Sequence, residues 1–192
     1  MNIKHFIIFL LILFGVFMEN KRNIGLFIWR VSYSHVIAYF IAGIFAVLVM
    51  GYQEHFLSEA LSFMRPVSSA IVALGPALQI FRGIFLSLVL LPLKNTFTEE
   101  KNGFAKLGVL ILGLSLFLTI GPTQGSFDGF IYTNIPFMYQ LLGYPESFLY
   151  ALIFISILWI SYKKQEKILD ILAIFVVILI CMMSIMGYFF AA

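Results

Sequence analysis

The chain alternates long apolar runs with short polar segments, and no soluble fold of its length could bury that much apolar surface. Hydrophobic residues make up 62% of the 192 positions and charged residues only 11%, whereas a soluble domain carries about 25% charged residues. Lipid is therefore the expected solvent, and helices satisfy the backbone in lipid. We predict an all-α integral membrane protein, a single polytopic domain over residues 1–192 with a bundle of about six transmembrane helices. The predicted spans cover residues 5–18, 33–52, 66–93, 105–120, 146–162 and 168–190.

The first of these runs, residues 5–18, is short and admits two interpretations. A signal peptide would have such an apolar stretch after Lys4, but it would end in small residues at a cleavage site. The sequence "ENKRN" follows instead, so we favour an uncleaved helix that is short or tilted. Residues 23–30 mix apolar side chains with Trp29 and Arg30, which is typical of a segment lying at the membrane interface.

The third run, residues 66–93, is too long for one helix perpendicular to the membrane. The pair Gly75-Pro76 divides it. Proline removes a backbone donor and clashes with the preceding turn. We therefore expect a kink or a break at this point, and predict that the helix is broken near Gly75-Pro76.

Connections rich in Lys and Arg alternate with connections poor in them. The rich ones are residues 19–30, 94–106 and 163–167, and the poor ones are residues 53–65 and 121–145. Basic loops face the cytoplasm in most membrane proteins. Loops 94–104 and 163–167 are therefore predicted to be cytoplasmic, and loop 121–145 and both termini extracytoplasmic. Small size and the absence of organelle signals favour a bacterial plasma membrane.

Several classes of function lack support in the sequence. The net charge of +3 comes from basic residues scattered near the ends of apolar runs, which indicates topology rather than a nucleic-acid surface. The single cysteine, Cys181, and the three histidines do not form a metal-binding pattern. No nucleotide-binding or hydrolase motif is present. We therefore predict no cofactor, no metal and no nucleic-acid partner.

Arg82 is the residue that most suggests a site, because it lies near the middle of a predicted span. A charge at that depth should face protein or a polar cavity. Gln79 and Gly75 share its helix face. We predict an outward-opening pocket floored by Arg82 and Gln79 and walled by Gly75-Pro76 and residues 125–134. Asp128 and Tyr132 in that loop complete the ligand site.

Two interpretations of Arg82 stay open. In the first, Arg82 satisfies the carbonyls freed by the helix break and forms a salt bridge with Asp128 that ties the loop to the bundle. In the second, Arg82 binds an anionic group such as a lipid phosphate or a carboxylate, both of which suit its planar fork of donors.

The second span holds two further patterns. His35 and Tyr39 share a helix face and could relay protons, but an interfacial histidine bonded to a backbone carbonyl is the commoner outcome, and we favour it. Ala38, Ala42 and Ala46 form a stripe of small residues that lets helices approach closely. We favour packing within the chain over a dimer interface.

These features predict a membrane protein that binds or moves an anionic or amphipathic small molecule, or a lipid, through the Arg82 pocket. One alternative is a non-catalytic subunit of a larger membrane complex. The other is a lipid-modifying membrane enzyme, which the absence of a nucleophile beside a base disfavours. The expected partners are membrane lipid, an anionic small molecule, and other membrane proteins or further copies of this chain.

Overall fold

The computed structural model describes residues 21–119 and 121–191, which form helices and no strand. Four helical segments are long and apolar enough to cross a membrane: Asn23–Leu48, Ala70–Thr98, Phe137–Lys164 and Lys167–Phe190. A fifth apolar helix, Gly103–Leu116, is shorter. The all-helical prediction is thus confirmed for the described residues, and the prediction of six spans is not. The predicted span 5–18 lies outside the described residues.

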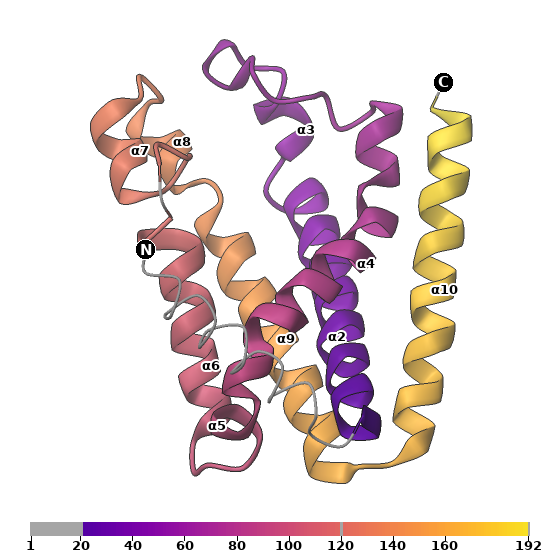
Figure 1. Ribbon diagram of the computed structural model, residues 1–192. Helices are drawn as coiled ribbons and strands as arrows, with labels where there is room; N and C mark the ends of the chain where they lie inside the picture. The colour runs from indigo at the N-terminus through magenta and orange to yellow at the C-terminus, as the bar shows by residue number, and fades with distance from the viewer. Residues whose placement is uncertain (1–20, 120, 192) are drawn as a thin grey trace, which may run out of the picture.

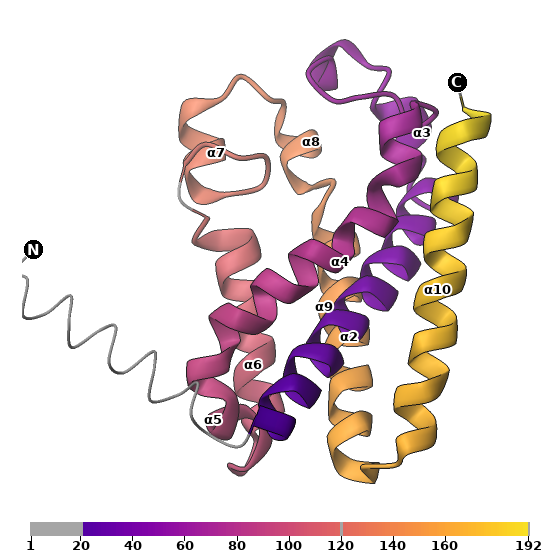
Figure 2. The same cartoon turned by 45° about the vertical axis from the view of Figure 1, so that its right-hand side comes forward.

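Successive long helices run in opposite directions, so the connections gather at two ends of the bundle (Figures 1 and 2). One end holds α5 and the link between α9 and α10, and the other holds α3, α7 and α8 (Figure 1). The elements are α2 (Lys21–Leu48), α3 (Tyr52–His55), η1 (Glu59–Leu61), α4 (Ala70–Leu90), η2 (Leu91–Leu93), α5 (Lys94–Thr98), α6 (Gly103–Leu112), the π-helix η3 (Gly113–Phe117), α7 (Phe127–Tyr132), α8 (Phe137–Leu141), α9 (Tyr144–Lys164) and α10 (Lys167–Phe190).

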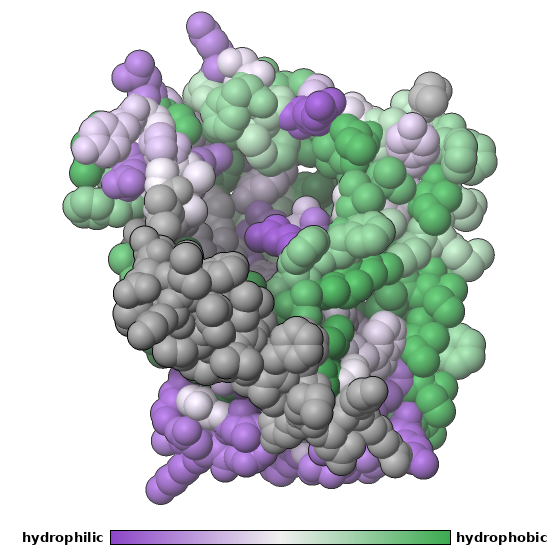
Figure 3. Space-filling model, viewed as in Figure 1, coloured by the Kyte–Doolittle hydropathy of each residue, from purple (hydrophilic) through white to green (hydrophobic). Residues whose placement is uncertain are grey.

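The outer faces of the bundle suit a lipid solvent. Large apolar side chains of α10, such as Phe175 and Leu179, are exposed along its length. Figure 3 shows hydrophobic side chains covering the side formed by α4 and α10, while hydrophilic ones gather at the end that holds α5. Such a band between polar ends is the pattern that membrane-spanning bundles present to lipid.

Helix α2 lies at the centre and packs against α4, α9 and α10. It corrects two predictions, because the expected interfacial segment 23–30 and most of the expected span 33–52 form one continuous helix, which ends at Leu48. Its most polar stretch is also buried, and the buried polar residues there are Arg30, Ser32, Ser34 and His35. Polar side chains are costly in lipid and face the bundle interior, which explains why this helix is central.

Small residues bring α2 close to its neighbours. Ala38, Ala42 and Ala46 are at most 1% exposed, which agrees with packing inside the chain. Where α2 crosses α4, a Cβ atom added to Gly83 would lie 2.9 Å from the Cα atom of Ser32. The two backbones therefore touch at Gly83, as helices in membranes do where small residues meet.

Helix α4 bends but does not break at Pro76, which lies inside a continuous helix (Figures 1 and 2). The predicted break is therefore wrong. The Ser184 hydroxyl of α10 forms hydrogen bonds with the α4 backbone at this point. Ser184 accepts a hydrogen bond from the Ala77 N–H at 3.2 Å and donates one to the Ala73 carbonyl at 2.5 Å. These two groups would bond each other in a regular helix, so the hydroxyl is inserted into the helical ladder.

Replacing Gly83 by alanine should destabilise the bundle, because the new methyl group would meet the α2 backbone. We expect a loss of about 1–3 kcal/mol in the free energy of unfolding, as overpacking typically costs. Gly75→Ala is the matched control in the same helix, since a Cβ atom there has no heavy atom within 4 Å. Unfolding in mild detergent measures both variants, and equal stability of the two would contradict the close crossing.

The Ser184 bridge predicts a coupling between two helices. Ser184→Ala should cost about 1–3 kcal/mol, because it leaves an amide and a carbonyl of α4 without partners. In a Pro76→Ala background the same change should cost less, since the helix can then close its own ladder. A double-mutant cycle of unfolding free energies measures the coupling. If the losses in unfolding free energy of the two substitutions are strictly additive, the stabilisation by Ser184 does not depend on the bend at Pro76.

Candidate functional site

Arg82 lines a cavity of about 240 Å³ enclosed by α2, α4, α6 with η3, and α9. The lining residues are His35, Tyr39, Ala42, Arg82, Ile111, Leu112, Ser115, Gly143, Glu146, Ser147 and Tyr150. Figure 3 shows hydrophilic side chains inside a hollow on an otherwise largely apolar face. The structure thus combines two features that the sequence suggested separately, the Arg82 site and the pair His35 and Tyr39.

His35 is 2% exposed, and both of its ring nitrogens have side-chain partners. Its Nε2 atom lies 3.0 Å from Gln79 Oε1, and its Nδ1 atom lies 2.6 Å from the Tyr150 hydroxyl. An amide oxygen only accepts, so Nε2 donates to Gln79, and in a neutral imidazole Nδ1 then accepts from Tyr150. The three side chains join α2, α4 and α9 near the middle of the bundle.

This network corrects the expectation for His35. We expected an interfacial histidine bonded to a backbone carbonyl, because the span was taken to begin at residue 33. The apolar helix begins at Asn23 instead, which places His35 near its middle. At that depth the imidazole needs partners inside the protein, and Gln79 and Tyr150 supply them.

Arg82 and Glu146 give the cavity charges of both signs. Both side chains line it, yet no ion pair joins Arg82 to an acidic side chain anywhere in the part of the chain that the structure describes. The Glu146 side chain is partly buried. The Arg82 side chain is exposed and lines the cavity from α4. Within residues 21–119 and 121–191, no acidic side chain therefore occupies the hydrogen-bond donors of Arg82.

A second, larger cavity of about 630 Å³ continues from the first toward the end that holds α3. The two share Tyr39, Ser115 and Glu146, among other residues. Apolar side chains of the 51–72 segment line its outer part: Phe56, Phe63, Met64, Val67 and Val72. The combined space is polar around Arg82, and the outer cavity is mostly apolar, with Arg65 as a charged residue in its lining.

Tyr52 lies at the wall of this outer cavity. Burial raises the pKa of its phenol above the usual range, and the nearby Glu146 carboxylate raises it further. The phenol therefore stays neutral at any ordinary pH and can donate a hydrogen bond.

The remaining predicted site residues lie elsewhere. Gly75, Pro76, Asp128 and Tyr132 are not among the residues that line either cavity. The predicted salt bridge between Arg82 and Asp128 is absent from residues 21–119 and 121–191. Asp128 lies in the first turn of α7, and Tyr132 is 73% exposed.

The 121–145 segment is held by its own hydrogen bonds, which explains why it does not need Arg82. Gln140 is 1% exposed. Its side chain accepts from the Gly125 N–H and donates to the Gly129 carbonyl and the Thr133 hydroxyl. The Tyr144 hydroxyl also donates to the Gly125 carbonyl at 2.8 Å. A buried glutamine therefore organises this segment.

Sequence reasoning missed Glu146 and Tyr150, although a signal was present. The two residues are four positions apart at the start of α9, so they share a helix face. His35 and Tyr39 have the same spacing on α2. Two polar pairs at helical spacing in two apolar helices would have indicated facing surfaces.

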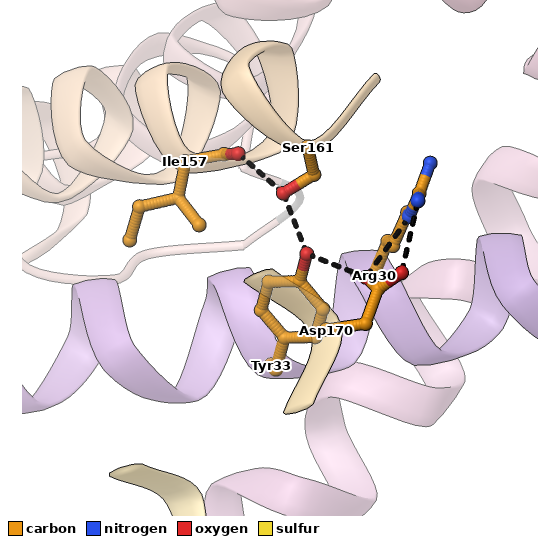
Figure 4. Close-up of polar contacts among 5 residues, drawn as sticks. All are labelled: Arg30, Tyr33, Ile157, Ser161 and Asp170. Atoms are coloured by element: carbon orange, nitrogen blue, oxygen red, sulfur yellow. Dashed lines mark hydrogen bonds and ion pairs between the residues drawn. The ribbon is translucent and has the colours of Figure 1, made fainter. Parts of the chain in front are cut away.

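A second polar cluster joins α2, α9 and α10 near the basic end (Figure 4). The Arg30 guanidinium donates to both carboxylate oxygens of Asp170, from Nε at 3.1 Å and from Nη2 at 2.9 Å. The Tyr33 hydroxyl donates to Asp170 at 3.2 Å and lies 2.5 Å from the Ser161 hydroxyl. We expected Arg30 at the membrane interface, whereas it is buried in this cluster. Asp170 lies in the first turn of α10, and its main partner is Arg30.

The described residues contain no group of three or more His, Cys, Asp or Glu side chains that could hold a metal ion. What the cavities offer chemically is a guanidinium, a carboxylate and neutral phenols beside apolar walls. Comparison of the chain with protein-family models, with curated proteins and with solved structures finds no match. The function must therefore be argued from the geometry.

The buried ion pair gives a prediction for stability. Arg30→Gln and Asp170→Asn should each cost about 3–5 kcal/mol, because each leaves one polar partner of a buried pair unmatched. The double variant should lose less than the sum of the two. Unfolding of the four proteins in detergent gives the coupling energy. A coupling near zero would mean that the pair does not hold α2 to α10.

Proposed function

We propose that this protein binds an amphipathic anion, a lipid or a lipid-like small molecule, with the headgroup at Arg82 and the apolar part in the outer cavity. The observation that carries the proposal is that Arg82 faces a cavity without an acidic partner among the described residues, and that this cavity opens into a larger apolar one. A charge kept at membrane depth is costly and usually serves a function.

The chemistry of the floor fits an anionic headgroup. A guanidinium offers planar, paired donors that match a phosphate or a carboxylate. His35 and Tyr150 line the cavity beside Arg82. Gln79, which was predicted as part of the floor, does not line the cavity and instead holds His35 in place through the histidine Nε2 atom. Tyr39 also lines the cavity.

The outer cavity fits the apolar part of such a molecule. Its wall contains Phe56, Phe63 and Met64, and aromatic and thioether side chains adapt well to flexible chains. Ligand sites commonly combine mostly apolar walls with a few polar groups that fix orientation. By the positive-inside rule the end with the lysines is cytoplasmic, so the pocket opens to the outside of a plasma membrane.

Binding is favoured over the two alternatives by particular contacts. A purely structural Arg82 would be packed against an acidic partner, but it lines a cavity instead. A lipid-modifying enzyme would need a base available to a nucleophile. His35 and Glu146 are the groups beside this cavity that could act as a base. Both nitrogens of His35 are engaged by Gln79 and Tyr150.

Three single substitutions test the proposal. The probe is a monoacyl lysophosphatidic acid with a 12-carbon chain, and the comparison ligand is the uncharged monoacylglycerol of the same chain. Arg82→Gln should weaken binding of the phosphate probe about tenfold or more, which is the value of a charge-assisted hydrogen bond. Glu146→Gln should strengthen it by removing a repulsive charge. Asp128→Asn should leave it unchanged, because Asp128 lies outside the cavity.

Affinities are measured by native mass spectrometry of detergent-purified protein, with thermal unfolding as a check on folding. Equal binding of the charged and uncharged probes would reject the anionic headgroup. Loss of probe binding in Asp128→Asn would indicate that Asp128 does act on Arg82, as in the salt-bridge interpretation. The proposal that Arg82 binds the headgroup without an acidic partner would then fail.

A further inference from the structure

We propose that the basic end of the bundle holds a second, independent binding site, which takes a phosphate-bearing anion. The site is a cavity of about 750 Å³ at the ends of α2, α5, α9 and α10. It shares no lining residue with the Arg82 cavity. Its existence does not depend on the function proposed for Arg82.

Arg30 forms the buried wall of this cavity. The residue is 3% exposed and lines the cavity. Its Nε and Nη2 atoms donate to Asp170, while the third guanidinium nitrogen points away from the other residues drawn in Figure 4. The Tyr162 ring lies 5.0 Å from the guanidinium carbon. Asp170 and Tyr162 thus fix the guanidinium in place, and its third nitrogen has no hydrogen-bond partner among residues 21–119 and 121–191.

Two lysines complete the positive wall. Lys94 begins α5 and Lys167 begins α10, and both line the cavity together with Glu99, an acid that forms no ion pair within the described part of the chain. The charge of Asp170 is balanced by Arg30. The lysines therefore outnumber the remaining acid, and the cavity has an excess of positive charge.

Position within the fold favours a phosphate at this place. Trp29 lines the cavity, and tryptophan collects at the depth of lipid headgroups. Basic pockets between transmembrane helices on the cytoplasmic side bind anionic lipid headgroups. A phosphodiester accepts from lysine and arginine donors at the same time, which the three basic residues permit. The same chemistry would accept free phosphate, and the experiment separates the two sources.

The test compares two double variants of the full chain. Lys94→Gln with Lys167→Gln removes both lysines of the cavity. Lys101→Gln with Lys164→Gln removes the same charge from the same end, at residues that do not line the cavity. All four side chains are at least partly exposed, so both proteins should fold. The probes are dioleoyl phosphatidylglycerol, dioleoyl phosphatidylcholine and inorganic phosphate.

Wild type should prefer phosphatidylglycerol over phosphatidylcholine in native mass spectrometry. The cavity variant should lose this affinity by about fivefold per lysine, or roughly thirtyfold in all, and the control variant by much less. Preference for the lipid over inorganic phosphate identifies a headgroup site, and equal competition by phosphate identifies a soluble anion in the same cavity. Equal losses in the two variants, or no preference for either anion, would overturn the proposal.

Discussion

Burial of the Arg30 guanidinium is the constraint on which the arrangement of the helices depends. An arginine within a membrane-spanning helix must meet a partner inside the protein, and Asp170 at the start of α10 is that partner. The pair holds the beginning of α10 against α2. Tyr33, one turn further along α2, contacts Ser161 of α9. These contacts fix the positions of α2, α9 and α10 along the bundle axis relative to one another. The central position of α2 follows from these contacts.

The same requirement organises the middle of the bundle. His35 is one helical turn and a half beyond Arg30 on α2, and it recruits Gln79 from α4 and Tyr150 from α9. The polar residues of α2 thus hold its neighbours in two successive layers. Arg82 stands at the edge of the second layer with no acidic partner in the described chain, which makes it the charge that the fold itself does not explain.

Composition and apolar periodicity were enough to predict an all-helical fold with several helices long and apolar enough to cross a membrane, and the connections 94–106 and 163–167 that were predicted to share an end do so (Figure 1). The limits of α2 could not be read in this way, because Arg30 is excluded from an apolar span unless its partner, 140 positions away, is known. Depth and spacing predicted Arg82, which lines a cavity, and Gln79, which contacts His35 outside that cavity's lining. Asp128 was a wrong choice of partner, since the segment that contains it is stabilised by Gln140, a contact that no local pattern reveals.

Two irregular helices line the cavity at Arg82. Helix α4 packs on α2 and α10, while α6 packs on α9. The bend at Pro76 turns the first part of α4 toward α10 and away from α6 (Figures 1 and 2). Ser184 of α10 forms hydrogen bonds with the α4 backbone there. On the opposite wall the helix widens into the π-turn η3, whose Ser115 lines both cavities. Such π-turns are frequent at functional sites. The bent helix α4 lines the cavity at Arg82, and the π-turn lines it at Ser115, so each of the two irregular helices contributes a polar side chain to this space.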